Sequence, residues 1–127
     1  MQRRTFIQAL FGGIGSAAMG FHLIARNHTT LIQESPVAGF QFYRGEAIWS
    51  LLGVGNKLSL VREPSNSHDC DAVAVYFGND QLGYIPQREN CAIAQMLDRG
   101  ENLETRITKV RDEMNPWRRI RIGIFKA

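Results

Sequence analysis

The sequence predicts a small α+β domain that is mainly β, a six-stranded β-barrel of the OB or SH3 kind with one definite helix and a short helical turn. Three observations favour this class: six short apolar segments separated by turn residues, a single helical stripe and no internal repeat. The chain has 127 residues, 44% hydrophobic and 21% charged, so one globular domain is expected. A domain of about 90 residues buries only ~60–65% of its unfolded surface, which leaves little room for an enclosed active site. We therefore predict a protein that is not an enzyme.

The first 35 residues are predicted to be a targeting signal or anchor with a linker, and not part of the fold. Arg3-Arg4-Thr5-Phe6-Ile7 precedes a weakly hydrophobic stretch, Ala9–Ala25, that contains no lysine, arginine or carboxylate. This pattern resembles the twin-arginine export signal, which implies a periplasmic protein. If the leader is not cleaved, residues 5–25 are long enough to anchor the chain in the inner membrane. A cytoplasmic location is the alternative, and residues 28–35 are predicted to be a polar linker.

The apolar segments of residues 36–127 predict the strands and helices of the domain. A stretch too short for a lone helix, residues 46–52, is expected to form one or two docked helical turns. The definite helix follows Pro86, carries an apolar stripe from Cys91 to Leu97 and ends at Gly100. Strands are expected at residues 37–43, 58–62, 72–77, 81–85, 103–111 and 117–126.

Two of these strands carry patterns that predict how they pack. Every position of Ala72–Phe77 is apolar, so both faces of this strand should be covered, as in a curled or closed sheet. In the last strand, Ile120, Ile122 and Ile124 alternate with other residues, and therefore share one face. We expect the three isoleucines to point into the core.

Four sequence elements in this order resemble the HIRAN domain, a β-barrel module of some Swi/Snf-type helicases and of small standalone bacterial proteins. The elements are Val37-Ala-Gly-Phe-x-Phe-Tyr43, Leu60-Val-Arg-Glu-Pro-x-Asn-x-His-Asp69, Ala72-Val-x-Val75 and Leu82-Gly-Tyr-Ile-Pro86. The resemblance covers about residues 36–124. It implies a barrel that binds single-stranded DNA and accepts the 3′ end of the strand in a pocket between barrel strands.

The resemblance also implies roles for particular side chains. Phe42 and Tyr43 would be the stacking surface, although one of two consecutive strand residues points inward and is then simply core. Asn66 and Asp69 would line the end pocket; the alternative is that they only hold their own loop by hydrogen bonds to its backbone. An aspartate repels phosphate but accepts a hydrogen bond from a free hydroxyl, so Asp69 suits a strand end.

Four further residues belong to the predicted site. His68 stands where the family often has tyrosine, and Gln41 and Gln87 stand where basic residues can contact phosphate. Tyr84 is expected at the rim of the barrel.

A basic and aromatic stripe near the C-terminus provides a second source of nucleic-acid affinity. Arg118, Arg119 and Arg121 follow Trp117, so stacking and phosphate attraction are combined on one predicted strand; an ordinary solvated strand face is the alternative. DNA binding calls for a basic rim around Phe42 and Asp69. A nearly neutral, apolar groove would instead favour a protein or peptide partner, the runner-up function.

No metal site, cofactor or catalytic residue is predicted. His68-Asp69-Cys70-Asp71 resembles a metal cluster only in composition, because adjacent strand residues point to opposite faces and no Cys-x-x-Cys pair supports it. Cys91 lies in the apolar helical stripe and is expected to be a small core residue. A disulfide between Cys70 and Cys91 in an oxidising compartment is left open.

Overall fold

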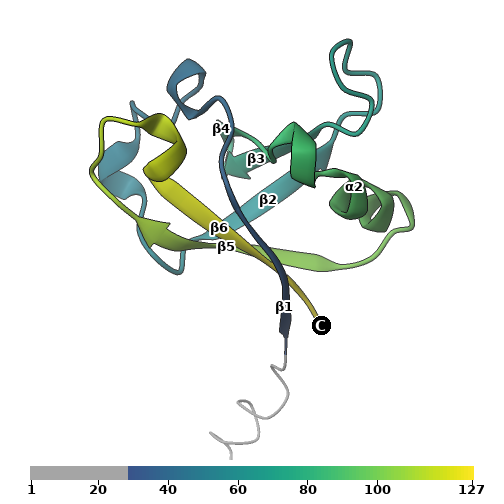
Figure 1. The fold of residues 1–127 in the computed structure, drawn as a ribbon. Helices are drawn as coiled ribbons and strands as arrows, with labels where there is room; N and C mark the ends of the chain where they lie inside the picture. Colours follow the sequence, from purple (N-terminus) through teal and green to yellow (C-terminus); the bar gives the residue numbers. More distant parts are fainter. Residues whose placement is uncertain (1–28) are drawn as a thin grey trace, which may run out of the picture.

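Six strands form one antiparallel sheet in the order β1-β6-β5-β2-β3-β4 in the computed structural model, which describes residues 29–127 (Figure 1). The strands are β1 (Thr30–Pro36), β2 (Lys57–Arg62), β3 (Val73–Phe77), β4 (Asp80–Tyr84), β5 (Leu103–Val110) and β6 (Ile120–Lys126). The α-helix α2 (Cys91–Asp98) is joined by four 3-10 turns, η2 (Phe40–Phe42), η3 (Trp49–Leu51), η4 (Gln87–Glu89) and η5 (Pro116–Arg118). The predicted fold class, mainly β with one helix and a short helical turn, is confirmed.

The two edge strands of the sheet, β1 and β4, are linked by one bridge just after β1 ends. The backbone N–H of Ala38 donates to the carbonyl of Tyr84 at 2.8 Å, and the N–H of Tyr84 donates to the carbonyl of Ala38 at 2.9 Å. A Cβ on Gly83 would lie 2.3 Å from the Ala38 carbonyl oxygen, so only glycine permits this approach. The sheet is therefore curled but not closed, as in a small open barrel.

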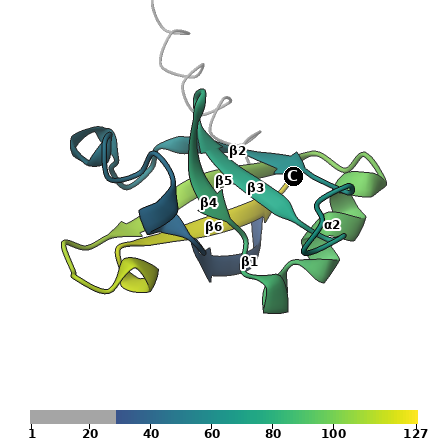
Figure 2. The same ribbon diagram turned by 90° about the horizontal axis from the view of Figure 1, so that it is seen from above.

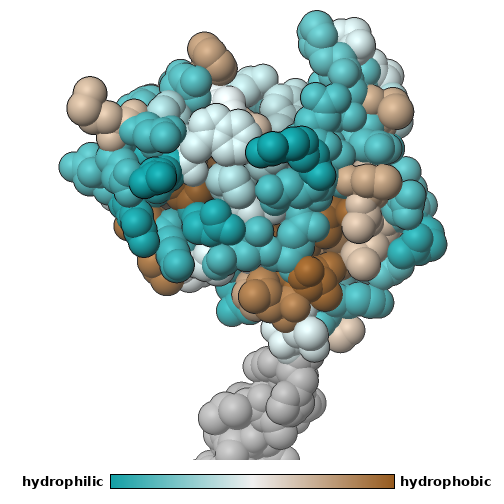
Figure 3. Space-filling view, viewed as in Figure 1, coloured by the Kyte–Doolittle hydropathy of each residue, from teal (hydrophilic) through white to brown (hydrophobic). Residues whose placement is uncertain are grey.

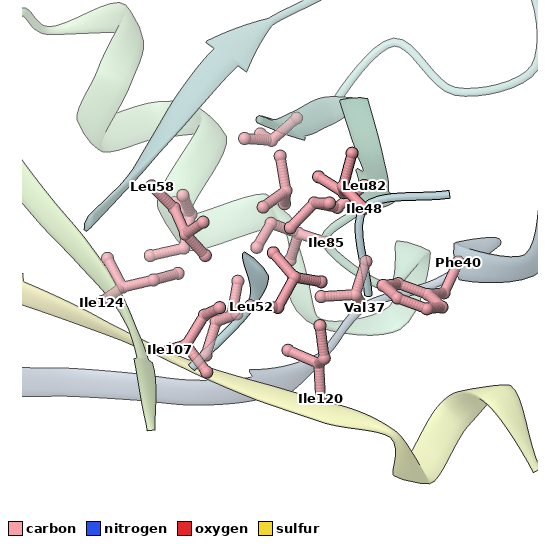
Figure 4. Close-up of a cluster of buried hydrophobic side chains, with 14 of the residues drawn as sticks. Val37, Phe40, Ile48, Leu52, Leu58, Leu82, Ile85, Ile107, Ile120 and Ile124 are labelled. Atoms are coloured by element: carbon pink, nitrogen blue, oxygen red, sulfur yellow. The ribbon is translucent and has the colours of Figure 1, made fainter. Parts of the chain in front are cut away.

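The core fills the inside of this curl. Ile120, Ile122 and Ile124 are all buried, which confirms the predicted alternation in β6. Figure 4 shows Ile120 and Ile124 among the side chains that β2, β4, β5 and the segment after β1 direct inward. The consecutive residues Ala72–Val75 are also buried, which confirms the prediction of two covered faces for this part of the strand, whereas Tyr76 and Phe77 are half-buried.

The predicted first strand at residues 37–43 is wrong: β1 is Thr30–Pro36, and all of it except Pro36 lies in the segment predicted as a linker. The chain turns at Gly39, where φ is 75°, and continues as η2. The polar side chains of residues 28–35 resemble those of a linker, because the residues that bind them lie far away in the sequence and leave no local pattern. Thr108 donates to Glu34 at 2.8 Å, and Ser35 donates to Glu89 at 2.7 Å, so polar residues of β1 are satisfied inside the fold.

Two smaller corrections concern the last strand and the helix. The predicted strand 117–126 begins only at Ile120, because Asn115 accepts a hydrogen bond from the Trp117 N–H at 3.0 Å and starts η5 instead. Cys91 is exposed and not core, since α2 buries Ile93 and Ala94 against the sheet. The helix itself begins at Cys91, after the separate turn η4.

The twin-arginine-like segment and the start of the predicted linker lie outside the described residues. Within residues 29–127, no helix has the length and apolar character needed to cross a membrane. The face in Figure 3 is largely hydrophilic, with apolar side chains gathered at its lower edge near the start of β1.

Candidate functional site

The loop between β2 and β3 is shaped by one asparagine. The side-chain oxygen of Asn66 accepts from the N–H groups of His68 at 2.8 Å and Asp69 at 3.2 Å. Its amide nitrogen donates to Glu63 at 3.2 Å, so the whole side chain is used inside the loop. The loop projects from the sheet as a hydrophilic prominence at the upper right (Figures 1 and 3).

Arg62 fixes the base of this loop. Its guanidinium donates to the carbonyl of Ala72 at 3.2 Å and to the Asp98 carboxylate on α2 at 3.2 Å. The loop is therefore tied both to the start of β3 and to the helix.

Asp69 is held from two sides. One carboxylate oxygen accepts from the N–H of Asp71 at 2.9 Å, and the other accepts from the side-chain amide of Asn90 at 2.7 Å. Asn90 is buried at the junction of η4 and α2, so its side chain is shielded from solvent. Because each carboxylate oxygen has two lone pairs, Asp69 keeps acceptor capacity for a further donor.

Two tyrosines form an aromatic corner beside Asp69. The rings of Tyr43 and Tyr84 meet edge to face, with centroids 5.8 Å apart and an interplanar angle of 70°. Tyr43 follows η2 and is 38% exposed, which leaves ring surface available. The Tyr84 hydroxyl donates to Glu63 at 2.9 Å. Burial raises the pKa of Tyr84 to about 12, and the Glu63 hydrogen bond acts in the same direction.

These elements enclose a pocket of about 300 Å³. Six of the ten predicted site residues line it, together with three that the sequence analysis did not single out for the site. The predicted ones are Tyr43, Asn66, His68, Asp69, Tyr84 and Gln87, and the added ones are Ala38, Ala72 and Ile85. The pocket thus spans the loop, the aromatic corner and the approach to η4.

Gln41 and Phe42 are not among the lining residues of the pocket. Both belong to η2 and are exposed, Phe42 to 78%. Of the two consecutive aromatics, Tyr43 is the one that lines the pocket, and neither of them is core.

The pocket itself has no lysine or arginine in its lining. The basic rim expected around it is therefore not present there, and Asp69 gives the lining an acidic character. Neutral polar groups and small apolar side chains make up the rest. Such a lining suits a ligand group without phosphate.

Arg119 and Arg121 lie away from this pocket. Arg119 donates to Glu46 at 2.7 Å, and its guanidinium lies 4.0 Å from the ring centroid of Trp49. Its side chain is only 12% exposed, so it holds the segment after β1 against β6. Arg121 pairs with Glu34 at 3.3 Å.

Glu63 is the functional neighbour that sequence reasoning missed. It accepts from both Asn66 and Tyr84, and so links the loop to the aromatic corner. Its place in the Arg-Glu-Pro-x-Asn element was the only signal.

Cys70 and Cys91 are both exposed and unpaired. They directly follow Asp69 and Asn90, the two residues joined by the 2.7 Å hydrogen bond. In the part of the chain that the structure describes, no group of three histidine, cysteine or acidic side chains could hold a metal ion.

The chain is similar in structure to two solved proteins. One is a protein from Lactobacillus plantarum, with a TM-score of 0.68 and 24% identity over 77% of this chain and 94% of that one. The other is the HIRAN domain of human HLTF, with a TM-score of 0.60 and 20% identity over 76% of this chain and 77% of that one. No curated protein matches the sequence. Since the HIRAN domain model matches residues 32–125, well over half of the sequence, the chain belongs to the HIRAN domain family.

Proposed function

We propose that this domain binds single-stranded DNA without catalysis and receives the 3′ end of the strand in the pocket beside Tyr43 and Asp69. One observation carries the proposal: aromatic surface and a carboxylate share a pocket whose lining has no lysine or arginine. An internal nucleotide brings a phosphate on each side, whereas a 3′-terminal nucleotide has a hydroxyl on one side. Family membership and the HIRAN resemblance, which implies this ligand, support the same proposal.

Tyr43 and Asp69 contact the strand end in this proposal, and Asn66 and Glu63 support them. The exposed surface of Tyr43 stacks on the terminal base, an interaction of about 1–3 kcal/mol. The free lone pairs of Asp69 accept a hydrogen bond from the 3′ hydroxyl. Asn66 and Glu63 act indirectly, because their hydrogen bonds hold the loop and Tyr84 in place.

A peptide- or protein-binding groove is the second candidate. The absence of basic residues from the lining and the small apolar residues Ala38, Ala72 and Ile85 favour it. We rank it second because the described part of the chain also has a basic, aromatic surface next to η2, which a neutral peptide would not require.

Fluorescence titration of the full chain with labelled single strands that end in a 3′ hydroxyl tests the proposal. Tyr43→Ala should weaken binding by roughly 5- to 150-fold, the equivalent of one base–aromatic stack. Tyr76→Ala is the matched control, since Tyr76 lies on β3 and does not line the pocket. If the unaltered chain binds no single strand even at low salt, the DNA proposal fails and the peptide groove replaces it.

A further inference from the structure

A second depression lies beside η5, at the opposite end of the sheet from α2 (Figures 1 and 2). It has a volume of about 170 Å³ and is formed by the β5–β6 hairpin. Its lining consists of four cationic side chains and one aromatic ring, namely Lys109, Arg111, Arg118, Arg121 and Trp117. Trp117 is 44% exposed, so part of its ring is open to a ligand.

Two of the four cations have carboxylate partners. Arg121 pairs with Glu34 at 3.3 Å, and Arg111 pairs with Glu113 at 3.6 Å. Neither carboxylate belongs to the lining of the depression. The pairs orient their guanidinium groups and leave further N–H donors, because each guanidinium carries five.

The other two cations, Lys109 and Arg118, are exposed and form no ion pair within residues 29–127. Asp112, which precedes Glu113 in the loop between β5 and β6, is exposed and likewise forms no ion pair among these residues. The four cations of the lining outnumber the three carboxylates Glu34, Asp112 and Glu113, so the depression keeps a net positive charge beside a half-exposed indole. Phosphate together with a base is the chemistry that such a surface fits.

The two pockets are connected through η2. This turn packs against η5, and Arg119, directly after η5, lies 5.7 Å from the ring centroid of Phe40 in η2. Tyr43 comes directly after η2 and lines the pocket beside Asp69, called the end pocket from here on. Trp117 belongs to η5 and lines the second depression, called the basic depression. Phe42, which is 78% exposed, belongs to the same turn η2.

We infer that the basic depression is a backbone-phosphate subsite for the nucleotides that precede the 3′ end. The inference rests on the proposed function, and it supplies what the end pocket lacks. The end pocket reads the terminus and offers no positive side chain to phosphate, so the attraction for the backbone comes from Lys109 and Arg118. Phe42 gives the strand an aromatic surface on its way from one pocket to the other.

The test measures how affinity grows with strand length. The full chain is titrated with 3′-hydroxyl strands of two and of about ten nucleotides, at about 50 and 200 mM salt. In the double variant Lys109→Gln/Arg118→Gln, the affinity for the long strand should fall most of the way to that for the dinucleotide. The affinity for the dinucleotide should stay the same. This variant neutralises two fewer phosphates than the unaltered chain. For the long strand, the ratio of the affinities at about 50 and 200 mM salt should therefore be about sevenfold smaller in the variant.

A matched variant controls for the change in net charge. Lys57→Gln/Arg99→Gln removes two exposed positive charges that line neither the end pocket nor the basic depression, so it should leave the length dependence unchanged. Circular dichroism melts of both double variants check that each still folds.

The outcomes separate this inference from the proposed function. If the Lys109/Arg118 variant behaves like its control, the basic subsite is overturned even when the strand end is still recognised. The unaltered chain could bind strands with different ends equally well while the Lys109/Arg118 variant still loses the dependence of affinity on strand length. That result would overturn the end pocket and support the phosphate subsite. Absence of any DNA binding overturns both.

Discussion

Ala38 and Tyr84 exchange two backbone hydrogen bonds, of 2.8 and 2.9 Å, across the open edges of the sheet. This single bridge brings Tyr43, five residues beyond Ala38, against the ring of Tyr84. The candidate pocket therefore depends on the curl of the barrel, and the bridge depends on Gly83.

Gly83→Ala should break this bridge. The new Cβ would lie 2.3 Å from the Ala38 carbonyl oxygen, which is backbone and cannot rotate away. We expect the free energy of unfolding to fall by about 2 kcal/mol or more, measured by urea denaturation. Gly53→Ala is the control, because nothing lies within 4 Å of a Cβ there. Equal stability of the two variants would show that the edges are not held together in this way.

The alternating isoleucines of β6 give a test of the core. Ile122 is fully buried, so Ile122→Asp places an unpaired carboxylate in the core at a cost of several kcal/mol, against the ~5–15 kcal/mol that usually stabilises a domain. Thermal melts should show no cooperative transition. Arg121→Gln, on the other face of the same strand, should still melt cooperatively. A normal transition for the aspartate variant would mean that the face of β6 is misassigned.

Tyr84 should lose its proton at a higher pH than an ordinary tyrosine. Its pKa of about 12 exceeds the value of about 10 for tyrosine in an unfolded chain, so between these pH values the unfolded chain loses this proton while the folded one keeps it. The free energy of unfolding should consequently fall as the pH rises above about 10.

An ultraviolet titration of the phenolates checks this directly. Tyr84→Phe should remove the titration step near pH 12, whereas Tyr76→Phe should leave that step in place. A step near pH 12 that survives Tyr84→Phe would contradict the burial of this hydroxyl against Glu63.

We propose that the chain is exported by the twin-arginine route, on the basis of Arg3-Arg4-Thr5-Phe6 and the weakly hydrophobic stretch that follows. Replacing both arginines by lysine preserves the charge but should trap the folded protein inside the cell. Immunoblots of periplasmic and cytoplasmic fractions measure the distribution. Unchanged recovery of the Lys-Lys form from the periplasm would remove the export proposal.

Local periodicity was enough to predict much of the fold. The alternation of Ile120, Ile122 and Ile124 and the apolar run at Val73–Val75 both follow from neighbours in sequence. By contrast, β1 was missed because the partners of Ser35 and Glu34 are Glu89 and Thr108, 54 and 74 residues away. Hydrogen bonds over such separations leave no local pattern.

The same distinction applies to the candidate site. Family resemblance pointed to six of the residues that line the pocket, but it could not separate Tyr43 from Phe42. It also could not show that Arg119, with its partner Glu46 73 residues away, is used inside the fold. Whether the lining residues bind DNA stays a prediction.

In the proposed function, Asp69 recognises a free 3′ hydroxyl in the pocket. The most direct measurement is the ratio of dissociation constants for one labelled strand carrying either a 3′ hydroxyl or a 3′ phosphate. A 3′ phosphate would bring like charge against Asp69 in a partly desolvated site, an effect of about 1–3 kcal/mol, so we predict a preference of about tenfold or more for the hydroxyl. Asp69→Asn, which keeps the shape of the side chain, should reduce this preference. Equal binding of hydroxyl-ended, phosphate-ended and circular strands by the unaltered chain would show that the pocket does not recognise the 3′ end.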